Sequence, residues 1–369
     1  MKTIEEKSGL GSEMNPVQTG NRTGSHQRAE RNGLYIGIDI GGTKIAGSLM
    51  RFRADGSYRV LDSQRIKVRR GGRQVVEDVT SVVLSLLDRN CVDGSGVGDD
   101  VDKTGERHMS VNGVGLCIPG RVDPEAGVVE NVANLDIGRL ALADEIHRTT
   151  GLPAHLENDV NAATLGSYIV LSQHRDPRLP KPQVGADVAV FLNLGTGVAA
   201  GVLRNGVLDS GFSGVAGEIG HIPVECQRWH CGCGQDGCIE TAAGGNAIRR
   251  QWPYADPPMP DIIAKAHDVS SSEHDKACET LDTVIGAIAD AIDILALAID
   301  PRIIMIGGGT TKTGKPLLDE IRAGLKKRAA SSAFIASLHL DERIAFVDPA
   351  EPIGCIGSAC AMAKTAGLQ

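Results

Sequence analysis

The residues most suggestive of chemistry in this 369-residue chain are three closely spaced cysteines, Cys231, Cys233 and Cys238, in the run CGCGQDGCIE. The run follows GEIGH, which ends at His221. Three thiolates and one imidazole form a Cys₃His set, which is the composition of closed, tetrahedral structural zinc sites. A closed site leaves no position for a substrate, so we expect this Zn²⁺ ion to support a loop and not to catalyse a reaction.

Small zinc modules often bind nucleic acids, but the whole chain argues against that class. Its net charge is −8 and aromatic residues make up 3% of it. A phosphate backbone attracts basic surfaces, and single strands stack on aromatic side chains. Cys226 and His230 lie beside the motif and stay open as alternative zinc ligands. We therefore expect no nucleic-acid partner and interpret the zinc site as a support within a larger α/β protein.

Three glycine-rich turns, each after an apolar strand, suggest a phosphate site. Glycines let backbone N–H groups approach phosphate oxygens, and a hydroxyl and an ammonium group add contacts in GIDIGGTK. Asp39 ends the first strand, where its carboxylate can hold Mg²⁺ or the water shell of the ion. A single turn of this kind is equally consistent with an ordinary hairpin, and the spacing is not that of a Walker P-loop. The predicted phosphate and magnesium residues are Asp39, Gly41, Gly42, Thr43, Lys44, Gly195, Thr196, Gly197, Gly307, Gly308 and Gly309.

Alternating strands and helices must position these turns. Buried strands are predicted at 34–39, 45–52, 111–119, 153–158, 187–195 and 302–309, and the apolar segment 198–206 follows the fifth of them. Helical spacing covers 75–88, 159–171 and 281–299, and loops are predicted at 91–110, 172–184 and 251–260. The pattern indicates an α/β protein with two lobes around a cleft.

The first 33 residues are polar and are predicted to be a disordered tail without a signal sequence. The longest apolar helix, 281–299, contains three aspartates, so we expect no membrane span. Nine cysteines without a secretory signal indicate reduced thiols and a cytoplasmic protein.

Four motifs together resemble the ROK family of bacterial sugar kinases and sugar-responsive repressors. They are GIDIGGTK, LENDVNAATLG (156–166), GVAGEIGH (214–221) and the cysteine run, and the resemblance covers about 34–367. It implies an actin-like ATPase (RNase H-like) two-lobe fold with a zinc-stapled loop in the larger lobe. The smaller lobe would span 34–153 and be completed by a C-terminal helix at 352–369. The larger lobe would span 154–351.

The resemblance also implies roles for individual residues. Asp159 would be the general base that accepts the proton of a sugar hydroxyl, and the start of its helix is expected to keep it ionised. The same four zinc ligands follow from the family motif: His221, Cys231, Cys233 and Cys238. The implied sugar-binding residues are Gly120, Asn134, Asn158, Asp159, Glu218, His221 and Glu240.

The implied function is an ATP-dependent kinase for the 6-hydroxyl of a hexose, with glucose first and N-acetylglucosamine or N-acetylmannosamine as alternatives. A weakly active sugar sensor is the other class, because repressors occur in the family. Only 33 polar residues precede the first strand, too few for a winged helix-turn-helix. ROK members are commonly dimers or tetramers, so a homo-oligomer is expected.

Two departures from the family pattern bear on this function. The second phosphate turn continues as VAAG, with Ala199 and Ala200 where glycines are usual. The segment after Asn134 reads LDIGR, without the tryptophan often found there. The first departure raises the question of whether two methyl groups narrow the phosphate turn, and the second puts the closing contact over the sugar in question.

Overall fold

The computed structural model describes residues 33–53, 56–90, 92–93, 100–101, 107–174, 176, 187–224 and 229–367. The predicted disordered tail lies outside the described residues apart from Gly33, and so do most of the predicted loops 91–110 and 172–184. Where 91–110 is described, it contains two short strands and the start of a long one at Arg107.

Three β-sheets are found among the described residues, and their strand order separates two lobes. The first sheet runs β10-β6-β1-β2-β3, with β4 and β5 beside β6; the second runs β13-β12-β11-β14-β15; and β7-β8-β9 form a small third sheet. The strands are β1 (Gly33–Ile40), β2 (Lys44–Phe52), β3 (Tyr58–Lys67), β4 (Val92–Asp93), β5 (Asp100–Val101), β6 (Arg107–Ile118), β7 (Arg121–Asp123), β8 (Val128–Val132), β9 (Ile137–Leu140), β10 (Ala154–Asn158), β11 (Val188–Leu194), β12 (Val198–Arg204), β13 (Val207–Leu208), β14 (Ile303–Gly307) and β15 (Ile344–Phe346).

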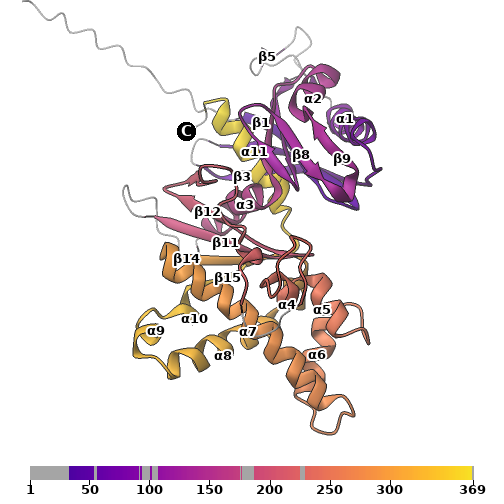
Figure 1. Cartoon of the computed structure of the whole chain (residues 1–369). Helices are drawn as coiled ribbons and strands as arrows, with labels where there is room; N and C mark the ends of the chain where they lie inside the picture. Colours follow the sequence, from indigo (N-terminus) through magenta and orange to yellow (C-terminus); the bar gives the residue numbers. More distant parts are fainter. Residues whose placement is uncertain are drawn as a thin grey trace, which may run out of the picture.

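The helices cover these sheets. They are α1 (Gly72–Arg89), α2 (Leu142–Thr150), α3 (Asp159–Gln173), α4 (Glu240–Ala243), α5 (Gly245–Gln251), α6 (Pro258–Ala266), α7 (His274–Ile299), α8 (Lys315–Ala330), α9 (Ala333–Ser337), α10 (Leu340–Arg343) and α11 (Ile353–Thr365), with 3₁₀ turns η1 (Ala133–Leu135), η2 (Ile219–His221) and η3 (Gly309–Thr313). Figure 1 shows the first sheet with α1 and α2 in one lobe, and α4 to α10 in the other.

Helices α3 and α11 form a layer between the two sheets. The yellow C-terminal helix α11 crosses back to the first lobe in Figure 1 and packs against α3, β1 and β6. One buried cluster joins Tyr35 of the first sheet, Phe191 of the second and Ile356 of α11. The two lobes therefore share a core at this layer, and the strand ends that carry the glycine turns lie beside it.

The strands at the centre of each sheet agree with the sequence prediction because they are continuous apolar runs. In β1 every residue is buried except Asp39, which is half-buried. The parallel order β10-β6-β1 brings the carboxyl ends of these strands to one edge of the sheet. Asp39 and Asn158 therefore lie at the same edge of the sheet, although they are far apart in the sequence.

Several elements differ from the sequence prediction. The strands β3 and β7 to β9 and the helix α2 were not predicted. The predicted loop 251–260 ends inside a helix, since α6 begins at Pro258, and proline suits the first helical turn because its missing N–H has no partner there. The predicted lobe boundaries stay a prediction, but β10, which starts at Ala154, pairs with β6 of the first sheet.

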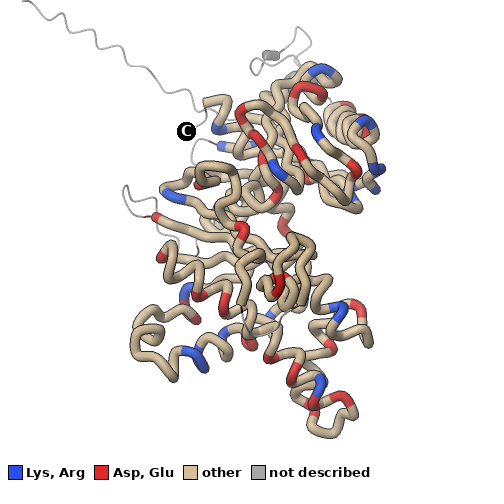
Figure 2. The backbone as a smooth tube through the Cα atoms, in the orientation of Figure 1, with Lys and Arg blue, Asp and Glu red and all other residues tan. Residues whose placement is uncertain are grey.

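The charge distribution bears on the predicted partners. Figure 2 shows basic and acidic positions interspersed along both lobes, without one continuous basic band over the described part of the chain. Among these same residues, no helix has the length and hydropathy needed to cross a bilayer. Asp282, Asp290 and Asp293 interrupt the apolar pattern of α7, as the sequence analysis noted.

Candidate functional site

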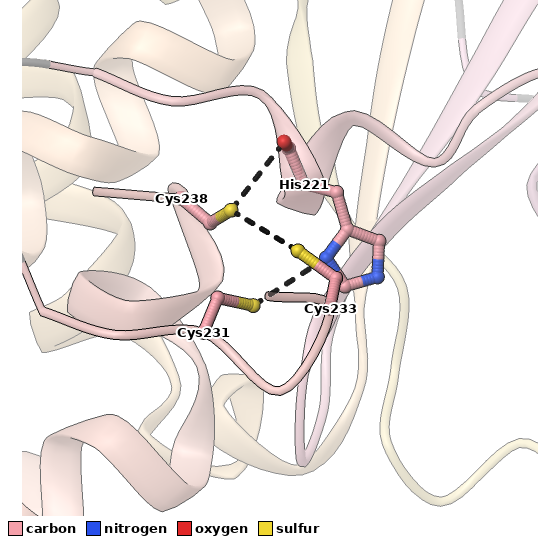
Figure 3. Close-up of side chains that lie close together, drawn as sticks. All are labelled: His221, Cys231, Cys233 and Cys238. Carbon is pink, nitrogen blue, oxygen red and sulfur yellow. Dashed lines mark hydrogen bonds between the residues drawn. The ribbon is translucent and has the colours of Figure 1, made fainter. Parts of the chain in front are cut away.

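The four predicted zinc ligands come together in the second lobe. Figure 3 shows Cys231, Cys233, Cys238 and His221 pointing toward one another, and their donor atoms all lie within 4.8 Å of one another. The Cys231 Sγ to His221 Nδ1 distance is 3.6 Å, and Cys233 Sγ to Cys238 Sγ is 3.7 Å. A tetrahedral zinc ion with ordinary bond lengths needs edges of about 3.6 Å for S–N and about 3.8 Å for S–S. The residues therefore fit Zn²⁺.

The protonation chemistry of the cluster also favours a cation. Burial and the neighbouring thiols raise the pKa of Cys238 to about 12, whereas N–H groups of Gln235 lower the pKa of Cys233 to about 6. Thiolates this close repel one another unless a cation lies between them, and zinc binding deprotonates its cysteine ligands. The donor set is thus suited to a metal and unfavourable as free thiols.

Of the two alternative ligands, the one that the structure describes, His230, does not join this cluster. The imidazole Nδ1 of His230 pairs with Asp236 Oδ1 at 3.0 Å on the exposed side of the loop. Cys226 lies outside the described residues. The motif ligands therefore form the only His/Cys group of this kind in the part of the chain that the structure describes.

Backbone pairing connects the zinc loop to two predicted sugar residues. Val224 N–H donates to the Gly237 carbonyl (2.7 Å) and Ile239 N–H to that of Ile222 (3.1 Å), so the segment after His221 lies antiparallel to the segment before Glu240. The Nε2 atom of His221 lies 3.9 Å from Glu218 Oε2, while Nδ1 faces the thiols. One imidazole can therefore offer Nδ1 to the metal while Nε2 faces Glu218.

Asp159 begins α3, but the residue that caps this helix is its neighbour. The side chain of Asn158 accepts the N–H groups of Val160 (2.9 Å) and Asn161 (3.2 Å) and donates to the Gly120 carbonyl oxygen (3.3 Å). Asn158 thus caps the helix start, and the carboxylate of Asp159 accepts the Val160 N–H at 3.0 Å.

The electrostatic environment of Asp159 opposes the effect of the helix start on its ionisation. Burial raises its pKa to about 6, and the negative charges of Asp39 and Glu218 add to this rise. The Val160 N–H lowers the pKa but does not outweigh burial. A carboxylate with a pKa near 6 is ionised at neutral pH and is a stronger base than an ordinary aspartate.

The loop before Glu218 depends on a glycine. Gly217 has φ = 97°, and a Cβ atom there would lie 1.9 Å from the Ala200 carbonyl oxygen. The carbonyl of Gly217 in turn accepts the Ala200 N–H at 2.7 Å. The close approach of Gly217 to β12 therefore fixes the backbone position of the next residue, Glu218.

Substitution of Gly217 by Ala is expected to lower the free energy of unfolding by about 1–3 kcal/mol, because it adds both strain and a backbone clash. Gly286 on α7 is the matched control: no heavy atom lies within 4 Å of a Cβ placed there. Gly286→Ala should stabilise the helix by about 0.5–1 kcal/mol. Urea unfolding of both variants measures this, and equal midpoints would contradict it.

Glu240 lies against the second phosphate turn. Its Oε2 atom accepts the Val198 N–H at 3.2 Å, and a Cβ on Gly197 would lie 2.0 Å from the same oxygen. The glycine therefore makes room for the carboxylate. Of the two alanines that follow, Ala200 is 3% exposed and packs in the core of the second lobe, so its methyl group does not narrow the turn. Ala199 is half-buried, and the question about its methyl group remains with it.

The first glycine turn lies at the end of β1. Gly41 N–H donates to the Lys44 carbonyl (2.9 Å), and the side chains of Thr43 and Lys44 are exposed. The amide of Asn134, on η1, lies against Gly42. Burial raises the pKa of Asp39, and the charge of Lys44 partly offsets this. After Asn134, Ile137 packs into the core of the first lobe.

A pocket of about 500 Å³ in the second lobe holds the remaining glycine turns, a size typical of small-ligand sites. Gly195, Thr196, Gly308 and Gly309 line it, whereas Gly307 is buried and packs against Phe191. A hollow of about 750 Å³ between α1 and α2 contains none of the predicted site residues.

Other residues that the sequence analysis did not select also line the 500 Å³ pocket. They are Asn193, Gly245, Ile248, Arg249, Pro257, Pro258, Met259, Pro260, Thr310, Lys312 and Thr313. Asn193 opens the NLGTG motif and was detectable from it. The cations Arg249 and Lys312 have no local motif that distinguishes them from other charged residues, because they reach the pocket only through the packing of α5 and η3.

The sheets, the shared helical layer and the zinc-supported loop define an actin-like two-lobe α/β protein. Residues 35–345 match the model of the ROK family, and the chain belongs to this family. It is 29% identical over 301 residues to a glucokinase of Thermotoga maritima, covering 78% of this chain and 85% of that one. It is also 29% identical over 276 residues to an N-acetylmannosamine kinase of Vibrio cholerae, covering 74% and 83%.

A solved structure shares this architecture. The ROK family glucokinase from Streptomyces griseus in complex with glucose and AMPPNP is 25% identical, with a TM-score of 0.63. The similarity covers 89% of this chain and 99% of that chain.

Proposed function

We propose that this chain is an ATP-dependent sugar kinase that phosphorylates the 6-hydroxyl of a hexose, with glucose as the leading substrate. One observation carries the proposal: the parallel order β10-β6-β1 places Asp159, which directly follows β10, at the same sheet edge as Asp39 beside the first phosphate turn. Asp159 also lies close enough to Glu218, in the loop before His221, for the charge of Glu218 to raise its pKa. A carboxylate between a phosphate site and a hydroxyl-binding site is what phosphoryl transfer to an alcohol requires.

In the proposed reaction Asp159 accepts the proton of the sugar hydroxyl while its oxygen attacks the γ-phosphorus of ATP. The bond from that phosphorus to the bridging oxygen of ADP breaks, and ADP leaves with the electron pair. The glycine turns at Gly41 and Gly195 contribute N–H groups to the phosphates. Mg²⁺, when bound, neutralises phosphate charge, and Asp39 is the carboxylate that suits it.

The sugar contacts follow from the same arrangement. Glu218 and His221 face each other at 3.9 Å and offer an acceptor and a ring nitrogen to sugar hydroxyls. The amide of Asn158 is held by Gly120 and is assigned to the same sugar. Glu240 supports the phosphate turn through one oxygen, and we assign its other oxygen to the sugar. The 500 Å³ pocket is assigned to the nucleoside of ATP.

N-acetylmannosamine is the second candidate substrate, with N-acetylglucosamine beside it. The relative named for N-acetylmannosamine has the same 29% identity as the glucokinase, so overall similarity does not separate the two sugars. A sugar sensor with little turnover is the other class, and the half-buried Ala199 at the phosphate turn is the feature that favours it.

Turnover is expected to depend on pH through Asp159. Above its pKa of about 6 the carboxylate is ionised and accepts the proton; below it the carboxyl is protonated and cannot. The kcat/KM for the sugar should therefore fall about tenfold for each pH unit below 6. A pH–rate profile with saturating ATP measures this, and a profile that stays flat down to about pH 5 would contradict the assignment.

The direct test is a coupled ADP-release assay with Mg-ATP and glucose, N-acetylglucosamine or N-acetylmannosamine in parallel, accompanied by calorimetric sugar titrations. Turnover with one sugar supports the kinase and identifies the substrate. Sugar binding without turnover supports the sensor. If none of the three sugars is bound or phosphorylated, the proposed substrate class is rejected.

A further inference from the structure

Three hydrogen-bonded polar side chains, Glu157, Asn161 and Ser210, connect the two lobes beside Asp159. The Nδ2 atom of Asn161 donates to Glu157 Oε1 at 3.0 Å and to Ser210 Oγ at 3.1 Å. Glu157 is only 6% exposed. Burial of a carboxylate without hydrogen bonds lowers the stability of the fold. The Asn161 amide is therefore expected to hold Glu157 in place, and its second hydrogen bond does the same for Ser210.

On one side of this hydrogen-bonded group, Glu157 fixes the peptide that precedes the proposed base, Asp159. Glu157 lies on β10 of the first sheet, and its Oε1 atom also accepts the N–H of Asn158 at 2.9 Å. Asn158 in turn caps α3 and donates to the Gly120 carbonyl oxygen. The Glu157 carboxylate therefore holds the backbone from which Asp159 projects.

On the other side of this group, Ser210 fixes the loop that carries Glu218. Ser210 follows Asp209, whose N–H donates to the Val202 carbonyl at 2.9 Å on β12 of the second sheet. The Ser210 carbonyl then accepts the Ala216 N–H at 3.2 Å and closes the loop. A displacement of Ser210 is thus passed to Glu218 two residues after this closure.

Asparagine suits the junction because its amide nitrogen carries two hydrogens that can serve two acceptors at once. One acceptor, Glu157, lies on β10 of the first sheet, and the other, Ser210, lies in the loop that follows β13 of the second sheet. Asn161 itself lies on α3, in the layer shared by the lobes. Aspartate offers no donor at this position, and an aliphatic side chain leaves the Glu157 carboxylate without this partner.

We propose that Asn161 is a positioning residue that sets the sugar-binding loop at Glu218 in register with the base Asp159, through Ser210 on one side and Glu157 on the other. This inference rests on the proposed kinase function and deepens it. A purely structural role would lower stability without a selective effect on the sugar. A positioning role raises the KM for the sugar and leaves the KM for ATP unchanged, because none of Glu157, Asn161 and Ser210 lines the pocket assigned to the nucleoside.

The test uses Ser210→Ala, Ser210→Thr, Asn161→Ala and the double variant Asn161→Ala/Ser210→Ala in the full-length protein. Ser210→Ala removes one hydrogen bond and is expected to raise the sugar KM, and the sugar Kd from calorimetry, about 3- to 10-fold. Ser210→Thr keeps the hydroxyl and should restore both values. Asn161→Ala should also lower kcat about tenfold, because the Asn158 peptide loses its support.

The double variant tests whether the residues act through one bond. Its sugar KM should equal that of Asn161→Ala, since the Ser210 bond is already absent there. Ser331→Ala, at the exposed end of α8, is the control for loss of a serine hydroxyl and should match the wild type.

Two negative outcomes are distinguishable. A wild type that neither binds nor turns over any sugar overturns the proposed function and this inference with it. A wild type that is active while Ser210→Ala keeps the wild-type sugar KM and Kd overturns only the inference. Equal rises in the sugar and ATP KM, or multiplicative effects in the double variant, also overturn it.

Discussion

Replacement of Asp159 by Asn is expected to lower sugar-dependent ADP release by about 10²- to 10⁴-fold, because an amide cannot accept the proton of the attacking hydroxyl. The sugar KM should change less than kcat, since asparagine keeps the size of the side chain and one acceptor oxygen. The measurement is the coupled assay at saturating ATP, corrected for sugar-independent hydrolysis. Activity above about a tenth of the wild type would exclude Asp159 as the general base.

The same variant should be more stable than the wild type at neutral pH. The folded pKa of Asp159, about 6, lies above the ordinary value of 3.8, so ionisation of this carboxylate destabilises the folded state. Removing the charge should contribute about 1–3 kcal/mol at pH 7–8. The gain should shrink as the pH falls from 6 toward 4, where the wild-type carboxyl is also neutral.

Thermal unfolding of both proteins across that pH range measures the difference. Asp282→Asn, on an exposed position of α7, is the matched control and should keep the activity and the stability of the wild type. If Asp159→Asn is less stable than the wild type, the electrostatic explanation is wrong. The prediction about turnover is tested independently by the coupled assay.

Loss of the zinc site is the second large effect that we expect. Cys238→Ser should reduce bound zinc from about one per chain to near zero, since serine replaces a buried thiolate ligand of a four-ligand site. Without the metal, the segments around His221 and Glu240 lose the ion that joins them. Sugar-dependent kcat/KM should then fall about 10- to 100-fold, the range typical for removal of the supports of a site.

Elemental analysis and the coupled assay on the same preparation provide the measurement. Cys278→Ser, which removes a half-buried thiol on α7 outside the cluster, is the control and should keep both zinc and activity. A folded, active wild type with essentially no zinc would reject the metal assignment. Full activity of zinc-free Cys238→Ser would reject the supporting role of the zinc loop.

The zinc ligands were predictable because their information is local. The three cysteines and His221 lie close together in sequence, and a closed metal site needs only suitable donors at a suitable spacing. The glycine turns are similar: each follows an apolar strand, and glycine is required where the backbone approaches another group. Gly307 is the exception, because it packs against Phe191 of the neighbouring strand and lies outside the pocket.

The raised pKa of Asp159 was not predictable from the sequence. Its position before a helix indicated only that the helix start favours the ionised form. The rise in pKa comes from burial and from the charges of Asp39 and Glu218, which belong to other elements. Burial and the distances between charges are set by the tertiary structure, so the order of residues along the chain does not reveal their effect on the pKa.

The amino-acid sequence by itself determined the family, the strand–turn scheme and the donor set for zinc, because each depends on residue types at short, regular spacing. Only the tertiary structure decided which atoms meet across the lobes. The parallel order β10-β6-β1 brings Asp39 to Asp159, and the packing of α3 between two sheets joins Asn161 to Ser210. Such contacts arise from the folding of distant segments onto a common core, so no local pattern encodes them.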